Sequence, residues 1–126
     1  MSEKEVEAVK RVIEEAYMDG INRNQDKEAA KIGFHRDFRM LVLRDDELSK
    51  VSIDEWFDRI EGRKAENPEM FRNRVSRAVF HLVDVAGNAA VAKLDVYRND
   101  EFYSTDYMLL YKFVDGWKIV SKVYTT

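Results

Sequence analysis

Cysteine is absent from this 126-residue chain, and histidine and proline are scarce, with two residues and one residue. Without cysteine the chain can form no disulfide and offers no thiolate as a nucleophile or metal ligand. The two histidines have no carboxylate triad at metal-ligand spacing, so no zinc or iron site is predicted. The five glycines are scattered over predicted turns and helix ends instead of forming a phosphate-binding loop. The sequence therefore predicts neither a metal nor a cofactor.

Long apolar runs and a strong net charge are also missing. No apolar run approaches the roughly 20 residues of a membrane-spanning helix, and a formal net charge of −3 does not attract polyanions in general. Arg74 and Arg77 fall on opposite faces of a predicted strand and so make no single nucleic-acid-binding patch. The opening segment, MSEKEVEAVK, has no apolar signal-peptide core. We expect a cytoplasmic protein with no nucleic-acid or membrane partner.

What the chain does have is the composition of a folded domain. Hydrophobic residues make up 45% and charged residues 36% of it, which is typical of a globular protein. The length allows a core that needs no metal or disulfide for support. There is no internal repeat or linker, so we predict one domain over residues 1–126.

The first half of the chain is predicted to be helical. Helical periodicity between N-terminal capping signals and glycine stops predicts three helices, over residues 2–20, 26–33 and 52–62. Ser2-Glu3-Lys4-Glu5 and Ser52-Ile53-Asp54-Glu55 both have the spacing of a capping box. A β-prone segment at residues 38–43 lies between the second and third helices, and a loop is predicted around Asn67-Pro68.

From residue 72 onward, apolar residues recur with the period of two that is typical of strands. Three turn signals, at Gly87-Asn88, Asn99-Asp100 and Asp115-Gly116, divide this half into four antiparallel strands. Three helices followed by a four-stranded meander predict an α+β fold in which the helices cover one face of a long antiparallel sheet.

Both faces of the predicted sheet carry apolar side chains. A loop at Gly87-Asn88 puts Val79, His81, Val83 and Val85 on one face with Leu94 and its neighbours, and leaves Phe80 and Leu82 on the other. After the last turn, Trp117, Ile119 and Val123 are predicted on one face, and Val120 and Tyr124 on the other. Exposed apolar area costs about 25 cal/mol per Å². We predict a homodimer formed through the sheet face; the alternative is a monomer with a half-apolar exposed sheet.

Three stretches resemble motifs of the nuclear transport factor 2-like superfamily. Residues 17–20, YMDG, resemble the end of its first helix, and residues 34–38, FHRDF, resemble the segment before its first strand. DYMLL at 106–110 followed by DGWKIV at 115–120 resembles the ending of its putative lumazine-binding, SnoaL-like branch. The resemblance covers nearly the whole chain. It implies a cone-shaped, cystatin-like fold with a pocket between the helices and the concave sheet face.

The resemblance implies the fold more narrowly than the activity, because the superfamily includes enzymes, ligand binders and interaction modules. We favour a dimeric protein whose apolar and aromatic pocket binds a small, flat, mostly apolar ligand. One alternative is a small lyase or isomerase of the polyketide cyclase or dehydratase kind. The other is a protein-interaction or assembly module with a filled cone.

Tyr17, His81 and Asp106 are the candidate catalytic residues. Tyr17 occupies the place where ketosteroid isomerase-like members carry an oxyanion-stabilising tyrosine, and its alternative role is a core contact of the first helix. The positions of that family's base correspond to Leu41 and Val42, which cannot accept a proton, so this isomerase chemistry is not predicted. A one-residue change in strand register decides whether His81 and Asp106 share a face, and both registers stay open.

Four further residues are candidates for contacting a ligand: His35, Trp56, Tyr107 and Tyr124. An aromatic ring such as that of Trp56 could stack on a flat ligand, or it could anchor its helix in the core. His35 falls at the corner between the second helix and the first strand. There its alternative role is a hydrogen bond to the nearby backbone.

Overall fold

The structure is a computed structural model that describes residues 3–126. Its helices are α1 (Glu3–Val12), the π-helix η1 (Ile13–Arg23), α2 (Lys27–Gly33), α3 (Ile53–Glu66) and α4 (Pro68–Asn73). Its strands are β1 (Phe34–Arg44), β2 (Glu47–Ser52), β3 (Ser76–Ala86), β4 (Ala89–Arg98), β5 (Glu101–Phe113) and β6 (Gly116–Thr125). The first predicted capping residue, Ser2, lies outside the described residues.

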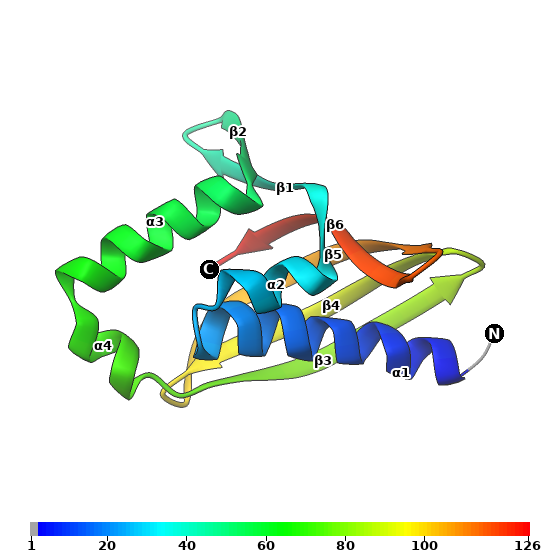
Figure 1. Cartoon of the computed structure of the whole chain (residues 1–126), viewed down its shortest axis with the longest axis horizontal. Coiled ribbons are helices and arrows are strands. Elements are labelled where there is room, and N and C mark those ends of the chain that lie inside the picture. The colour runs from blue at the N-terminus through cyan, green and yellow to red at the C-terminus, as the bar shows by residue number, and fades with distance from the viewer. Residues whose placement is uncertain (1–2) are drawn as a thin grey trace.

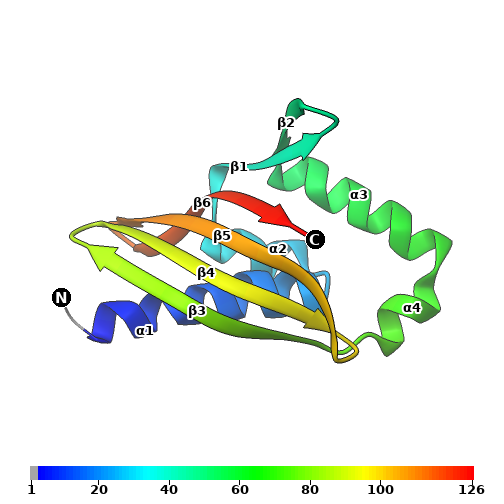
Figure 2. The same ribbon diagram turned by 180° about the vertical axis from the view of Figure 1, so that it is seen from behind.

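The strands form one curved sheet in the order β2-β1-β6-β5-β4-β3. β1 and β6 pair in parallel, and the other neighbours are antiparallel. The helices α1, η1 and α2 lie across one face of the sheet, whereas α3 and α4 extend beyond it on the side away from the N-terminus (Figure 1). The view from behind shows β3, β4 and β5 in front of α1 (Figure 2). The predicted α+β fold, with helices packed on a long curved sheet, is confirmed.

Several element boundaries differ from the sequence-based ones. The first strand begins at Phe34, before the predicted residue 38, and the unpredicted strand β2 pairs with it across a tight turn at Asp45 and Asp46. Both aspartates have positive φ, 50° and 66°, which is the conformation of a two-residue hairpin turn that Asp tolerates. The predicted loop after the third helix contains the short helix α4, which begins at Pro68 with Asn67 as its N-cap.

The first helix passes Gly20 and ends at Arg23, since its second part is wound as η1. Gly20 serves close packing instead of termination, because a Cβ atom there would lie 3.0 Å from the Cα atom of Ala30 in α2. A Cβ atom on Gly33 would lie only 2.5 Å from that of Ala16. These two glycines let α2 lie directly against η1.

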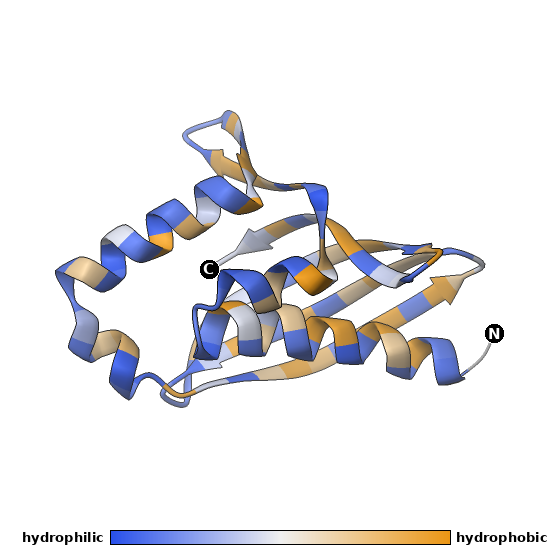
Figure 3. Ribbon diagram, viewed as in Figure 1, coloured by the Kyte–Doolittle hydropathy of each residue, from blue (hydrophilic) through white to orange (hydrophobic). Residues whose placement is uncertain are grey.

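The third helix forms as predicted at its N-terminus and continues to Glu66. The Ser52 hydroxyl accepts a hydrogen bond from the Glu55 amide at 3.1 Å, and the Glu55 carboxylate accepts one from the Ser52 amide at 2.8 Å, which completes the capping box. Hydrophobic and hydrophilic residues alternate along α3 as in an amphipathic helix (Figure 3). Its buried stripe contains Trp56, Phe57 and Ile60.

Three β-bulges decide which side chains enter the cone. A bulge adds one unpaired residue to a strand, so the side chains on its two sides follow opposite alternations. The extra residues are His81 in β3, Tyr103 in β5 and Val120 in β6. The bulge at Val120 turns Lys122 and Tyr124 to the helix-covered face and Val123 outward. The faces predicted for Val123 and Tyr124 were therefore wrong, because the sequence pattern assumed an uninterrupted strand.

Candidate functional site

A small cavity lies between the helices and the sheet, lined by residues of η1, β1, α3, α4 and the strands β4, β5 and β6. Its volume is about 80 Å³. A buried water needs roughly 10–15 Å³ measured this way, so the cavity has room for several waters or for a ligand of a few heavy atoms. Pockets for drug-sized ligands begin at roughly 300 Å³. The cone is thus neither filled nor large.

Asp106 of β5 is fully buried behind two side chains that line this cavity, those of Tyr17 and Ser104. The Tyr17 hydroxyl donates a hydrogen bond of 2.5 Å to Asp106 Oδ2, and the Ser104 hydroxyl donates one of 2.9 Å to Oδ1. Burial, followed by the charge of Asp106, raises the pKa of Tyr17 well above its ordinary value, so its phenol stays protonated. Because its one proton points to Asp106, the Tyr17 hydroxyl donates no hydrogen bond into the cavity.

Lys122 of β6 extends into the same space with its side chain only 5% exposed. Its Nζ atom lies 4.9 Å from the centre of the Tyr17 ring, 4.7 Å from that of Trp56 and 4.6 Å from that of Tyr124. Ring faces at these distances attract an ammonium group through their quadrupoles. Three aromatic residues from η1, α3 and β6 therefore surround one cation.

The polar surroundings of the Lys122 ammonium are weak. Its hydrogen bond goes to the Met40 thioether at 3.8 Å, a poor acceptor, and Asp106 Oδ2 lies 3.9 Å away, within ion-pair range but beyond hydrogen-bond range. Burial lowers the pKa of Lys122 to about 8; the Asp106 charge opposes this shift and the Arg98 charge adds to it. Among the described residues, the Lys122 ammonium therefore has N–H donors without a strong acceptor, and these can bind a ligand.

Two arginines converge on Asn22 at the end of η1. Arg74 Nη2 donates to the Asn22 carbonyl oxygen at 2.9 Å, and Arg98 Nη2 donates to Asn22 Oδ1 at 3.0 Å. Each guanidinium also lies over a ring, at 4.6 Å from the Phe71 centroid for Arg74 and 3.6 Å from the Tyr103 centroid for Arg98. Both Nε atoms are buried and lack a hydrogen-bond partner among the described residues.

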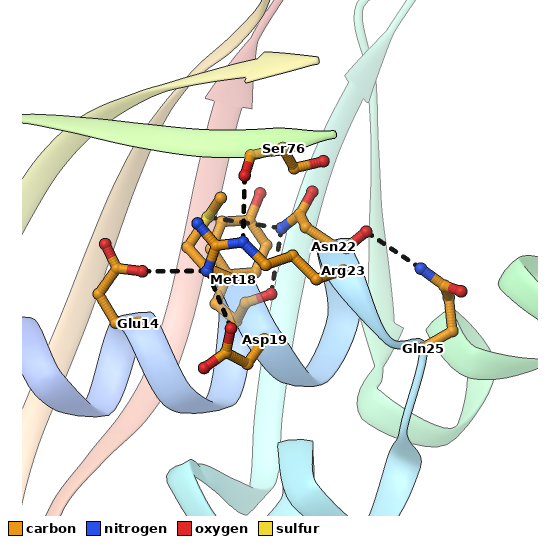
Figure 4. A network of polar contacts seen from close by, with 8 residues as sticks. Glu14, Met18, Asp19, Asn22, Arg23, Gln25 and Ser76 are labelled. Atoms are coloured by element: carbon orange, nitrogen blue, oxygen red, sulfur yellow. Dashed lines mark hydrogen bonds and ion pairs between the residues drawn. The ribbon is translucent and has the colours of Figure 1, made fainter. Parts of the chain in front are cut away.

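The end of η1 that carries Asn22 is itself anchored (Figure 4). The Asn22 amide nitrogen donates to the Tyr17 carbonyl oxygen at 3.1 Å. Arg23 Nε donates to the Ser76 carbonyl oxygen of β3 at 3.1 Å, and Gln25 Nε2 donates to the Asn22 carbonyl oxygen at 3.0 Å. This network holds the amide of Asn22 at the place where the two arginines meet.

The charge of the cavity is positive. Its lining includes four cationic side chains, those of Arg63, Arg74, Arg98 and Lys122, and among the described lining residues there is no carboxylate. Burial first, and then the neighbouring Arg98 charge, lowers the pKa of Arg74 to about 10, so the group remains charged at neutral pH. Cations held together in a partly desolvated space favour a bound anion.

Comparison with known proteins assigns the whole chain to a family. A family model described as "Putative lumazine-binding" matches residues 4–125. The chain belongs to this family. Two solved NTF2-like proteins of unknown function have the same fold: one from Shewanella baltica OS155 with 24% identity and a TM-score of 0.75, covering 99% of this chain and 95% of that one, and one from Silicibacter pomeroyi DSS-3 with 22% identity and a TM-score of 0.76, covering 99% and 98%.

A domain of unknown function with a cystatin-like fold from Nostoc punctiforme PCC 73102 is also similar, with 13% identity and a TM-score of 0.71, covering 99% of this chain and 78% of that one. No curated protein matches the chain. The predicted putative lumazine-binding family is confirmed, and the solved structures confirm the predicted fold. Likeness at these identities establishes the fold, and the activity must be argued from the site.

Of the three catalytic candidates, Tyr17 and Asp106 lie together in the structure, and His81 lies apart from them. The bulge at His81 places it on the open face of the sheet, where Nε2 lies 2.9 Å from Asp95 Oδ2. Asp106 pairs with Leu94 across the sheet. Its side chain is buried on the opposite face. The face predicted for His81 was wrong, since the unpaired bulge residue changed the alternation.

The ligand-contact candidates also divide. Trp56 and Tyr124 line the cavity. His35 lies at the corner between α2 and β1. There its Nδ1 accepts a hydrogen bond from the Asp37 amide at 3.0 Å, and its ring stacks on that of Phe113. Tyr107 is 41% exposed on the open face of the sheet. Neither His35 nor Tyr107 is part of the cavity lining.

Sequence reasoning missed Lys122, Asn22 and the pair Arg74 and Arg98. Lys122 falls on the outer face in a strand without a bulge, so the period of two hid it. The one available indication in the sequence was Asn22, a polar residue five positions after Tyr17. Residues five positions apart share a helix face only where the helix is π-wound, as η1 is.

The described residues contain neither a helix that could span a membrane nor a cluster that could hold a metal ion. No helix in residues 3–126 is long and apolar enough to cross a bilayer. Within the same residues, no three His, Asp or Glu side chains cluster closely enough to hold a metal ion. The cytoplasmic location predicted from the sequence stays a prediction.

Proposed function

We propose that this protein binds a small ligand that carries a carboxylate or a similar anionic group, in the cone between its helices and its sheet. The observation that carries the proposal is the lining of the cavity, with four cationic side chains and no carboxylate among the described lining residues. The guanidinium groups of Arg74 and Arg98 each use one Nη2 atom on Asn22 and keep a buried Nε without a partner. An anion bound there satisfies these donors and relieves the repulsion between the two cations.

The aromatic side of the cavity supports a flat ligand body. Trp56 and Tyr124 present their rings on the side of Lys122, and flat groups pack well against such rings. The expected ligand is thus less apolar than the sequence indicated, because the bulge at Val120 turns Lys122 inward and Arg63, Arg74 and Arg98 also line the cavity. A filled cone, as an interaction module requires, does not fit a polar cavity of about 80 Å³.

The lyase or isomerase alternative is less well supported, because it needs a base that faces the ligand. Both Asp106 oxygens already accept hydrogen bonds, from Tyr17 and Ser104. The Tyr17 proton is directed to Asp106, and His81 lies on the other face of the sheet. Ligand binding needs none of these groups to change partner.

The test is a thermal-shift and calorimetry comparison of small carboxylates with their amides, for example benzoate with benzamide and pyruvate with pyruvamide. We expect the carboxylates to stabilise the protein and the amides not to; at 100 times Kd the gain is about 2.7 kcal/mol. Replacing the two arginines that meet at Asn22, Arg74→Gln with Arg98→Gln, is expected to remove the effect. Arg72→Gln is the matched control, because Arg72 is exposed on α4. Equal shifts from carboxylate and amide, or in the double variant and the control, would contradict the proposal.

We also propose that two copies of the chain associate through the open face of the sheet. That face carries half-exposed apolar side chains: Val79, Leu82, Tyr107, Leu109, Tyr111, Phe113 and Val123. Monomeric proteins rarely leave a continuous apolar surface of this kind in water. An antiparallel sheet with one covered face can bury the other against a second sheet.

Light scattering coupled to gel filtration tests the dimer. Leu109→Asp places a charge in the middle of the open face and is expected to give monomers. Ile32→Asp is the control, since Ile32 is 74% exposed on α2, on the helix-covered side of the sheet. A wild-type monomer at all concentrations, or an unchanged mass for Leu109→Asp, would rule the interface out.

A further inference from the structure

We propose that the amine of Lys122 forms an imine with the carbonyl carbon of a small oxo acid, an aldehyde or ketone whose carboxylate is held by Arg74 and Arg98. This inference rests on the proposed anion binding and names the chemical class of the ligand. It follows from three features of the cavity: a buried amine without a strong partner, surroundings that favour its unprotonated form, and a place for the carboxylate.

The first feature is that the Lys122 amine has no strong partner to displace. Its hydrogen bond goes to the Met40 thioether, and its ion-pair partner Asp106 lies at 3.9 Å without a hydrogen bond. Most lysines with a structural role are held by a carboxylate or by carbonyl oxygens, or extend to water. Lys122 is instead 4% exposed, and its Nζ atom is surrounded by ring faces.

The second feature is that the amine reaches its nucleophilic form near neutral pH. A lysine attacks a carbonyl only when it is unprotonated, and desolvation or a neighbouring cation is what produces that form. Burial lowers the pKa of Lys122 to about 8, and the Arg98 charge contributes in the same direction. At pH 7 about one-tenth of the side chain is then the free amine, against less than a thousandth for a lysine exposed to water.

The chemistry balances without an oxidant or a reductant. The ammonium first loses a proton to solvent, which a pKa of about 8 allows near neutral pH. The nitrogen lone pair then forms a bond to the carbonyl carbon, and the C=O π electrons move to oxygen, which takes up a proton. Loss of the nitrogen's second proton and of this oxygen as water leaves the C=N bond. The net change is amine plus carbonyl to imine plus water.

The third feature selects the substrate class. Arg98 and Lys122 line the same cavity, and their charges act on each other. A carboxylate on the ligand that binds between Arg74 and Arg98 therefore places the rest of the ligand beside the amine. The volume of about 80 Å³ restricts the ligand to a few heavy atoms, as in the short oxo acids.

Reductive trapping tests the inference. The full-length protein is incubated at pH 7 with sodium cyanoborohydride and glyoxylate, succinic semialdehyde or propanal, and the labelled lysines are identified by peptide mass spectrometry over time. We expect an oxo acid to label Lys122 at least tenfold faster than it labels any other lysine. We also expect the oxo acid to label Lys122 faster than propanal does, because propanal has no carboxylate. Lys122→Met should abolish the fast phase, whereas Lys93→Met, on the open face of the sheet, should leave it unchanged.

The outcomes separate the two proposals. Labelling of Lys122 no faster than that of Lys93 overturns the imine, while carboxylate binding is judged by its own thermal shift. Fast labelling of Lys122 that is equal for glyoxylate and propanal overturns the role of the arginines, and with it the oxo-acid class. Fast labelling that falls tenfold for glyoxylate, but not for propanal, in the Arg74→Gln and Arg98→Gln double variant supports both.

Discussion

Replacing Lys122 with methionine is expected to make the protein more stable, although it removes a buried ion pair. Burial holds the pKa of Lys122 at about 8 instead of its ordinary value of 10.5. At about 1.4 kcal/mol per pH unit, this difference means that the charged side chain destabilises the fold by about 3 kcal/mol at pH 7. The lowered pKa already includes the attraction of Asp106, so this figure is net of the ion pair. Methionine removes the charge and keeps an unbranched side chain within the three rings.

The gain should depend on pH in a defined direction. The unfolded chain releases the Lys122 proton near pH 10.5 and the folded protein releases it near pH 8, so between these values the unfolded state binds more protons. Stability of the wild type relative to Lys122→Met therefore rises through this window. The full advantage of methionine is present below pH 8, and it disappears above about pH 10.5.

Urea unfolding of both proteins at pH 7 and pH 10 measures this effect, and the difference between the two proteins cancels the titration of all other groups. At pH 7 a gain of about 3 kcal/mol corresponds to roughly 10 °C in Tm for a domain of this size. Lys64→Met is the control, because Lys64 is half-buried on α3, outside the proposed dimer interface, and its replacement is expected to change stability little. A variant less stable than the wild type at pH 7, or a gain that is the same at both pH values, would refute the reasoning.

Four further substitutions, one of them a control, test packing, a buried hydrogen bond and a helix cap by chemical denaturation. Gly33→Ala should lower the free energy of unfolding by about 1–3 kcal/mol, since the new Cβ atom would lie 2.5 Å from that of Ala16. The control Gly62→Ala has open space around it in α3 and should raise the free energy of unfolding by about 0.5–1 kcal/mol. Equal effects of the two substitutions would contradict the close packing of α2 on η1. Tyr17→Phe removes the 2.5 Å hydrogen bond to buried Asp106 and should cost about 1.5–3 kcal/mol; an unchanged midpoint would mean that this bond contributes nothing net. Ser52→Ala removes the N-cap of α3 and should cost about 1 kcal/mol, and a neutral result would show that the cap is replaced by water.

The fold class followed from local signals that tertiary packing did not override. The capping box at Ser52 and the apolar stripe of the third helix formed as predicted, because both depend on residues three or four positions apart. The turn at Gly87 formed between β3 and β4, where its φ of 59° favours glycine. The turn predicted at Asp115-Gly116 lies one residue earlier, since Gly116 pairs with Phe113.

The candidate site was predictable only in part, and the reason is physical. Tyr17, Trp56 and Tyr124 could be proposed from residue type, and all three line the cavity. The direction of a strand side chain depends on counting from a turn, and one unpaired residue reverses the count. A bulge has no reliable signature in a single sequence, so Lys122 was assigned no role and His81 was given the wrong face.

The bulge at Val120 is one reason why the cone is polar inside a sheet whose pattern is apolar. Without the extra residue at Val120, the alternation of β6 would point Val123 inward and Lys122 to water, and the cavity would lose the cation that three rings surround. The bulge reverses this choice and buries an amine at a cost that the altered pKa of Lys122 measures. Arg74, with its pKa lowered to about 10 by burial, adds a second such cost. Costly buried groups in one cavity are what a binding site needs and what a core avoids, so the stability that Lys122→Met restores should be lost again as ligand affinity.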